Sequence, residues 1–254
     1  MRDDVHTRQD AIVAAARVEG RVVTEALADR LGVSPQTIRK DLNELCGRGA
    51  LARVHGGAVL AGGTENLRYE RRRAMHGVEK DAIGRAVAAL IPPRASLFMT
   101  IGTTTEAAAR ALSAHEGLMV VTNNLNVANL LRVQPEIEVV LAGGTVRAAD
   151  GGIVGEAAVD FINGFKVDHA VIGVSAIDAD GGLLDYDLRE VKLAHAVMAN
   201  ARSVILAADS SKFERAAPVR IGDLSRVSTL VTDKAPPHIR AICEAADVAL
   251  VETS

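Results

Sequence analysis

Residues 34–46 read Ser-Pro-Gln-Thr-Ile-Arg-Lys-Asp-Leu-Asn-Glu-Leu-Cys, and this stretch decides the fold of the N-terminal part of the chain. Ser34 is a favourable N-cap, and Pro35 fits the first helical position, where no amide hydrogen is needed, so a helix is predicted to begin there. The apolar residues repeat with the spacing of a buried stripe: Ile38, Leu42 and Leu45. The opposite face then carries polar side chains suited to DNA base edges: Gln36, Arg39, Lys40 and Asn43.

Two further helical runs precede this segment. Residues 7–18 form an amphipathic run ended by Gly20, and Thr24 is predicted to cap a second run. Gly32 supplies a sharp turn before the polar-faced helix. Helices and a turn in this order are typical of a helix-turn-helix unit, whose last helix enters the major groove.

A β-hairpin wing is predicted directly after these helices. Residues 51–59 alternate like a strand and turn at Gly56-Gly57, which places Arg53 and His55 on one side. Arg53 is expected to reach phosphate or the minor groove. His55 is either a contact to the DNA backbone or a surface imidazole without a role.

The alternative for this region is an ordinary three-helix bundle whose polar face is only solvated. Arg pairs with guanine, and Asn or Gln with adenine, and each bidentate contact is worth about 1–3 kcal/mol of discrimination. A solvated face would more often include acidic residues, whereas Asp41 and Glu44 flank the apolar stripe instead. The DNA-reading interpretation is therefore favoured.

Composition limits the other classes of protein. A chain of 254 residues with 48% hydrophobic residues has room for one small and one larger domain. Cys46 and Cys243 are far apart, which predicts reduced thiols and a cytoplasmic location. The chain begins Met-Arg-Asp-Asp, with acid where a signal peptide is apolar, and it has no run of about 18 apolar residues, so neither secretion nor membrane insertion is expected.

Charge is divided unevenly along the chain. Residues 1–60 hold nine Lys or Arg and eight Asp or Glu, residues 61–80 hold five and three, and the remainder holds fifteen and twenty-one, which gives +1, +2 and −6. Because the basic excess near the DNA-reading unit is small, useful affinity requires several DNA heads acting together. A homo-oligomer, dimer or tetramer, is therefore expected.

The periodicity breaks after residue 60, which predicts a linker over residues 61–77 between a domain at 1–60 and a second domain at 78–254. Arg71, Arg72 and Arg73 within it are either additional DNA phosphate contacts or a solvated connector that packs on the second domain.

The second domain alternates helical runs with short apolar strands, the pattern of an α/β domain with a largely parallel sheet. Several strands end in small polar residues, and such ends converge on one crevice in an open α/β sheet. Residues 102–105, Gly-Thr-Thr-Thr, open a helix and offer amides, hydroxyls and the positive end of the dipole to a phosphate. A small phosphorylated ligand is therefore predicted.

Other strand ends supply the rest of the predicted ligand site. Asn123 and Asn124 are suited to polyol hydroxyls, Asp185 can accept hydroxyl hydrogen bonds, and Arg147 and Lys212 can neutralise phosphate charge. The alternative is that the Thr and Asn residues are plain helix caps and the cations are solvated.

Two sequence blocks match a known family. Residues 33–42, Val-Ser-Pro-Gln-Thr-Ile-Arg-Lys-Asp-Leu, and residues 53–58, Arg-Val-His-Gly-Gly-Ala, closely resemble the DeoR-type bacterial transcriptional regulators. Residues 121–129, 141–147 and 150–157 extend the resemblance over nearly the whole chain.

The resemblance implies a winged helix-turn-helix followed by an α/β sugar-phosphate-binding domain similar to ribose-5-phosphate isomerase and coenzyme A transferases. It implies a repressor that binds double-stranded operator DNA and is released by a phosphorylated metabolite, glycerol 3-phosphate or another sugar phosphate such as fructose 1-phosphate. No cofactor or metal is implied. The implied DNA contacts are Thr24, Ser34, Gln36, Thr37, Arg39, Lys40, Asn43, Arg53 and His55. The implied effector contacts are Gly102, Thr103, Thr104, Thr105, Asn123, Asn124, Gly143, Gly144, Arg147, Ser175, Asp185, Glu190 and Lys212. Family members commonly carry Asp where this chain has Thr100, which puts a carboxylate contact there in doubt.

An enzyme and a metal sensor are the other classes considered. Isomerisation needs a general base, and Glu190 is the only clear candidate. The carboxylate pair of the isomerases is missing, since this chain has Gly173, Ser175 and Ala176 after the corresponding strand. The seven histidines never pair at the spacing that puts two metal ligands on one helix face. The sequence thus predicts a regulator without catalysis.

Overall fold

The computed structural model describes residues 2–19, 21–47, 51–54, 56–60 and 69–253. The chain divides into two compact units, Met1–Glu65 and Asn66–Ser254, and each is described by itself. We call them the N-terminal unit and the effector unit.

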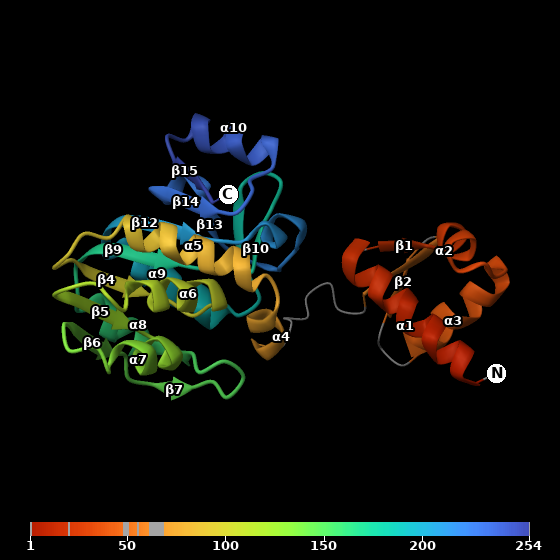
Figure 1. Ribbon diagram of the computed structural model, residues 1–254, viewed down its shortest axis with the longest axis horizontal. Helices are drawn as coiled ribbons and strands as arrows, with labels where there is room; N and C mark the ends of the chain where they lie inside the picture. The colour runs from red at the N-terminus through yellow and green to blue at the C-terminus, as the bar shows by residue number, and fades with distance from the viewer. Residues whose placement is uncertain (1, 20, 48–50, 55, 61–68, 254) are drawn as a thin grey trace. The chain divides into compact units, whose positions relative to one another are not determined.

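The N-terminal unit contains three helices and a small antiparallel sheet (Figure 1). Its elements are α1 (Arg2–Glu19), β1 (Arg21–Val23), α2 (Thr24–Leu31), α3 (Pro35–Gly47), β2 (Leu51–Val54) and β3 (Gly57–Leu60). The strands pair in the order β1-β3-β2. The predicted helix-turn-helix and the hairpin wing are confirmed, whereas β1 was not predicted.

Local sequence explains how α3 begins. The Ser34 hydroxyl accepts a hydrogen bond from the Thr37 amide at 3.2 Å, and Pro35 is the first helical residue. Gly32 ends α2 with φ of 63°, in the left-handed region that favours glycine. Ile38 and Leu42 are fully buried against the core side chains of the other two helices, as the apolar stripe predicts.

The effector unit is built on a seven-stranded parallel sheet. Its strand order is β15-β14-β12-β9-β4-β5-β6, with every neighbouring pair parallel. The strands are β4 (Ser96–Met99), β5 (Leu118–Thr122), β6 (Ile137–Leu141), β9 (Val167–Ile172), β12 (Ala201–Ala207), β14 (Thr229–Thr232) and β15 (Ala249–Glu252). This confirms the predicted α/β domain with a parallel sheet.

Helices cover both faces of this sheet (Figure 1). On one face lie α5 (Gly77–Ala89), α6 (Thr103–Leu112) and α7 (Leu125–Leu131), and on the other lie α8 (Glu156–Asn163) and α9 (Leu188–Ala199). The alternation along β4 shows why two cores form: Leu97 and Met99 pack into the first, and Phe98 packs into the second.

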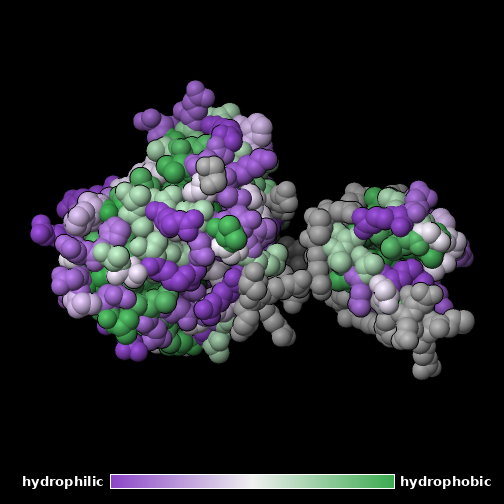
Figure 2. All heavy atoms as spheres, in the orientation of Figure 1, coloured by the Kyte–Doolittle hydropathy of each residue, from purple (hydrophilic) through white to green (hydrophobic). Residues whose placement is uncertain are grey.

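Shorter elements complete the unit. These are α4 (Tyr69–Ala74), the hairpin β7 (Thr145–Val146) and β8 (Ile153–Val154), the antiparallel sheet β10 (Ala176–Ile177), β11 (Gly182–Asp185) and β13 (Val219–Asp223), the 3₁₀ turns η1 (Ser210–Glu214) and η2 (Leu224–Arg226), and α10 (Pro237–Ala245). On the face shown in Figure 2, hydrophilic and apolar residues are interspersed over the effector unit. Among the described residues, no helix meets the length and apolarity needed to cross a membrane.

The strand order reverses between β4 and β9. From β4 the chain continues to β5 and β6 on one side, and from β9 it continues to β12, β14 and β15 on the other. Ligands of open α/β sheets bind outside the carboxyl ends of the strands at such a switch point. The loops after β4 and β9 are therefore where a site is expected.

The predicted linker, residues 61–77, is described only in its second half. Residues 61–68 lie outside the described residues, and residues 69–77 form α4 and the start of α5. This part belongs to the effector unit, and the Tyr69 hydroxyl donates a hydrogen bond to Glu106 of α6 at 2.6 Å.

Candidate functional site

The outer face of α3 presents the side chains expected to read DNA. Gln36, Arg39, Lys40 and Asn43 are all exposed. They line an open groove together with four further residues: Arg8, Ser34, Thr37 and Glu44. Within the described part of the N-terminal unit, Arg39 forms one long ion pair, to the exposed carboxylate of Glu25 at 3.6 Å, which holds its side chain only weakly.

A buried ion pair fixes α3 against α1. Asp41 is only 2% exposed, and its carboxylate accepts hydrogen bonds from Arg8 Nε at 2.6 Å and Arg8 Nη2 at 3.2 Å. Gln9 Nε2 donates to the same carboxylate at 3.4 Å and to Glu44 Oε2 at 2.8 Å. Sequence reasoning missed Arg8 and Gln9, since only tertiary packing brings α1 beside α3.

Three other predicted DNA contacts have different outcomes. Thr24 is 3% exposed and is the first residue of α2, and the N-cap position belongs to Val23, which makes no side-chain cap. The predicted capping role of Thr24 is therefore wrong, and its burial removes it from the DNA-facing surface. His55 and the side chain of Arg53 lie outside the described residues.

The loop after β4 leads into the N-terminus of α6. Gly102 occupies the N-cap with φ of 151°, and a Cβ there would lie 3.2 Å from Thr105 Oγ1. Thr103 and Thr104 follow in the first turn and are 8% and 5% exposed. Their hydroxyls make no hydrogen bond to any described residue, and the first amides of a helix have no partner within it. A helix end of this kind favours an anionic group.

Lys212, in the turn after β12, lines the same pocket as Thr103 and Thr104. Its side chain is buried, with the residue 9% exposed, and its ammonium has neither a hydrogen bond nor an ion pair within the described part of the chain. Burial, followed by the charge of Arg215, lowers the pKa of Lys212 to about 7. The buried carboxylate of Asp209 favours the charged form of Lys212 without forming an ion pair with it. A buried cation without an ion pair, beside a helix N-terminus, is the arrangement that an anionic ligand satisfies.

A second pocket adjoins the first and shares Asp185, Glu190, Ile101 and Gly173 with it. Asp185 accepts a hydrogen bond from the Ser175 hydroxyl at 3.0 Å. Burial, followed by the charge of Asp185, raises the pKa of Glu190 to about 7. Carboxyl groups of this kind accept hydrogen bonds from ligand hydroxyls.

Asn123 and Thr100 line this second pocket as well. Asn123 donates through Nδ2 to the Ile153 carbonyl at 3.0 Å, which leaves its side-chain oxygen as an acceptor. Thr100, at the position of the usual family Asp, accepts a hydrogen bond from the Gly173 amide at 3.3 Å through its hydroxyl. It therefore joins the loop after β4 to the loop after β9.

Arg147 was predicted to neutralise phosphate, but carboxylates already surround it. Its guanidinium donates to Asp150 at 2.9 and 2.6 Å and to Asp187 at 3.0 Å, and it also forms an ion pair with Glu190. Neither pocket is lined by Arg147. Because carboxylates of the protein neutralise its guanidinium, Arg147 positions Glu190 and does not face a ligand.

Four more predicted effector contacts line neither pocket. The Thr105 hydroxyl donates to the carbonyls of Thr100 and Gly102 at 2.8 and 2.7 Å. Asn124 is fully buried and caps α7, since its Oδ1 accepts from the Asn126 amide at 2.9 Å. Gly143 and Gly144 lie before β7 and line neither pocket. For Asn124, the alternative of a plain helix cap is therefore the one observed.

Sequence reasoning also missed Arg72 of α4, which lines the pocket that contains Lys212. The sequence predicts for residues 71–73 either contacts to DNA phosphate or a solvated connector, and nothing in this run of arginines indicates a contact with a pocket.

A metal centre is not seen either: within the described ranges, no cluster of His, Cys, Asp or Glu is arranged to hold a metal ion.

Comparisons with known proteins fit both units. The DeoR-like helix-turn-helix domain matches residues 8–63, and the DeoR C terminal sensor domain matches residues 75–234. The chain belongs to the DeoR family. It is 46% identical over 230 residues to the glycerol-3-phosphate regulon repressor of Escherichia coli and 48% identical over 232 residues to that of Haemophilus influenzae, with 91% of each chain covered in both comparisons.

The relatives of this DeoR-family protein are named as transcriptional repressors, which confirms the prediction of a DNA-binding regulator rather than an enzyme. Ribose 5-phosphate isomerase A from Neisseria gonorrhoeae is a solved structure with 12% identity, a TM-score of 0.39 and coverage of 53% of this chain and 52% of that one.

Proposed function

We propose that this DeoR-family repressor is released from its operator by a phosphorylated metabolite and that glycerol 3-phosphate is the effector. The observation that carries the proposal is Lys212, a buried and unpaired cation beside the free N-terminus of α6. The relatives named for the glycerol-3-phosphate regulon support the choice of metabolite.

The two adjoining pockets support a ligand with a phosphate end and a hydroxyl end. Lys212, Thr103 and Thr104 offer positive charge and donors in one pocket. Asn123 and Thr100 line the other, and the carboxyl groups of Asp185 and Glu190 lie where the two meet. A short polyol phosphate matches this division because its hydroxyls need acceptors and its phosphate needs donors.

The mechanism of release is a coupling between two sites. If the effector binds more tightly to the form of the protein that binds the operator weakly, it must lower operator affinity by the same factor that DNA lowers effector affinity. A coupling of about 1–3 kcal/mol per site, summed over a dimer or tetramer, is enough for induction. The small basic excess of residues 1–60, nine cations against eight anions, supports such an oligomer, because one DNA-binding unit alone would attract phosphate only weakly.

Fluorescence anisotropy tests the proposal. The full chain is first used to select its operator from a pool of random duplexes, and the complex is then titrated at constant salt with glycerol 3-phosphate, fructose 1-phosphate, glycerol and inorganic phosphate. Release by glycerol 3-phosphate at the lowest concentration is expected. Release by fructose 1-phosphate alone would assign the other effector, and no release by any phosphorylated compound would overturn the proposal.

Arg39→Ala is expected to weaken operator binding by roughly 5- to 150-fold, because a bidentate base contact is worth about 1–3 kcal/mol. The side chain is half exposed, at 51%, so the fold should tolerate its loss. Anisotropy with the selected operator measures the effect, and calorimetry should show unchanged effector affinity. Arg85→Ala, on the exposed side of α5, is the matched control; equal operator affinity for both variants would contradict the assigned role.

Thr104→Val removes one hydroxyl with little change of shape. We expect roughly tenfold weaker effector binding, since a hydrogen bond to a charged group contributes about 1.5–3 kcal/mol. Operator binding without effector should stay the same, because Thr104 lies in the effector unit. Thr105→Val is the comparison, as that hydroxyl bonds the backbone; it should cost stability and spare the phosphate contact.

Effector affinity is expected to fall as the pH rises from 7 to 9. Lys212, with its pKa lowered to about 7, loses its proton in this range, and Glu190, with its pKa raised to about 7, gains negative charge. Both changes disfavour a phosphate monoester, which stays a dianion because its second pKa is about 6. Calorimetry at pH 7, 8 and 9 measures this; an affinity that is constant or rises over the range would contradict it.

A further inference from the structure

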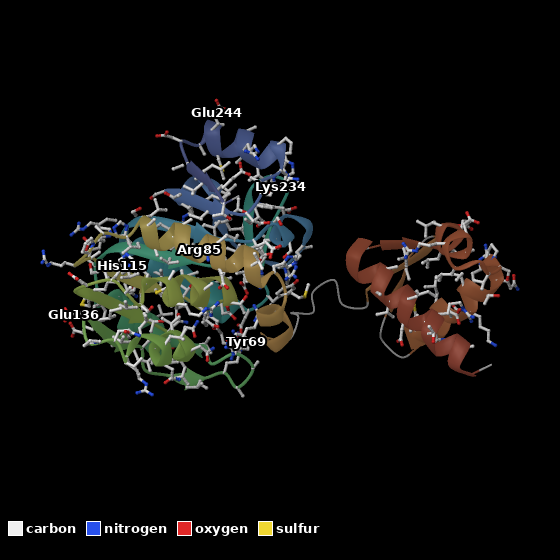
Figure 3. All side chains as sticks on the ribbon, viewed as in Figure 1. Tyr69, Arg85, His115, Glu136, Lys234 and Glu244 are labelled. Carbon is white, nitrogen blue, oxygen red and sulfur yellow. The ribbon has the colours of Figure 1, made fainter. Side chains whose placement is uncertain are left out.

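The short helix α4 belongs to the effector pocket. Tyr69 at its start, labelled in Figure 3, donates its hydroxyl hydrogen to Glu106 at 2.6 Å and accepts one from Asn126 Nδ2 at 3.2 Å. Burial, followed by the hydrogen bond to Glu106, raises the pKa of Tyr69. The other end is held by the buried ammonium of Lys80 in α5, which donates to the carbonyls of Arg72 and Met75. Both ends of α4 are thus bonded to helices of the effector unit: α6 and α7 at its start and α5 at its end.

Arg72 lies between these two attachments and is incompletely satisfied. Its side chain is 13% exposed, and its Nε is buried without a hydrogen-bond partner in the described structure. The one ion pair found for it runs from Nη2 to Asp150 Oδ2 at 3.7 Å. That carboxylate already accepts two shorter hydrogen bonds from Arg147, so it compensates Arg72 only weakly. A buried donor without a partner is costly, which calls for another acceptor.

The pocket supplies the place for that acceptor. Arg72 lines it together with Thr103, Thr104 and Lys212. The charge of Arg72 contributes to the lowered pKa of Lys212, so the two cations disfavour each other when no anion is between them. Lys212 is buried and Arg72 is partly buried, and no hydrogen bond or ion pair in the described structure joins either cation to Asp185 or Glu190, which line the same pocket. An anion between the two cations and the helix N-terminus would satisfy these donors.

We propose that Arg72 binds the phosphate of the effector and that this contact carries effector binding to α4. The inference rests on the proposed function. A guanidinium offers two parallel donors to phosphate oxygens, and phosphate binding would draw Arg72 away from Asp150. Eight residues, 61–68, separate the wing strand β3 of the N-terminal unit from α4. In chain order, α4 is therefore the first helix of the effector unit. A movement of Arg72 on phosphate binding would therefore displace the helix that directly follows the connection to the N-terminal unit.

Two variants of Arg72 and one neighbour test the contact in the full chain. Arg72→Gln is expected to weaken binding of glycerol 3-phosphate, and of inorganic phosphate, by 10- to 100-fold in calorimetry. Arg72→Lys should recover part of this affinity, because it restores the charge without the bidentate geometry. Arg73→Gln, on the exposed neighbour in the same helix, should bind as the wild type does.

Release from the operator supplies the second measurement. In anisotropy, Arg72→Gln should bind the operator with wild-type affinity and need at least tenfold more glycerol 3-phosphate for release. Wild-type effector affinity in Arg72→Gln would overturn the inference alone, provided that the wild type binds glycerol 3-phosphate. Absence of binding of any phosphorylated metabolite by the wild type would overturn the proposed function and the inference together. A loss in Arg72→Lys as large as in Arg72→Gln, with an equal fall in melting temperature, would assign Arg72 a structural role instead and also overturn the inference.

Discussion

Lys212→Met is expected to weaken effector binding by roughly 100-fold. Lys212, in the turn η1 after β12, lines the pocket at the N-terminus of α6 and forms no ion pair within the described structure, although the buried carboxylate of Asp209 attracts it from a longer distance. Loss of a charge-assisted contact in a buried site costs about 1.5–3 kcal/mol, and each 1.4 kcal/mol is tenfold in affinity. The variant should remain on the operator at effector concentrations that release the wild type.

The stability of the same variant distinguishes a binding role from a structural one. Burial disfavours the charged form of the ammonium and lowers its pKa to about 7, whereas the buried carboxylate of Asp209 favours the charged form. Replacement by an apolar side chain of similar length removes both effects, so we expect only a small change in the free energy of unfolding. Chemical denaturation measures this, and Lys192→Met on the exposed side of α9 is the control. Unchanged effector affinity in Lys212→Met would contradict the assignment of the phosphate site.

Asp41→Ala is expected to abolish operator binding at 37 °C. The change removes the carboxylate that Arg8, with a side chain 18% exposed, binds at the contact between α1 and α3, and it leaves Gln9 with its hydrogen bond to Glu44. Removal of one partner of a buried pair costs about 3–5 kcal/mol, which is most of the stability that a unit of this size possesses. The recognition helix would then lose its support.

The expected measurement is an unfolding transition of the N-terminal unit at lower denaturant concentration, with effector affinity unchanged because the effector unit has its own cores. Asp29→Ala removes an exposed carboxylate from α2 and serves as the control. If Asp41→Ala unfolded like the control and bound the operator normally, the ion pair would have no supporting role.

The sequence determined the features that depend on near neighbours in the chain. The Ser34 cap, the apolar stripe of α3 and the turn at Gly32 follow from spacings of a few residues, and the structure has them as predicted. The polar ends of the parallel strands also located the crevice, because the carboxyl ends of such strands share one edge of a sheet.

Only the tertiary structure decided which polar residues face a ligand. The sequence predicts Arg147 as a phosphate contact, but the fold places Asp187 and Glu190, some forty residues later in the chain, beside its guanidinium. The side chains of Asn124 and Thr105 form hydrogen bonds to backbone groups nearby, and these buried groups would otherwise have no partner. The sequence predicts Arg72 as part of a linker, whereas in the structure it lines the same pocket as Lys212. Contacts between residues far apart in sequence leave no local pattern, so the charge that is free for a ligand is decided by packing.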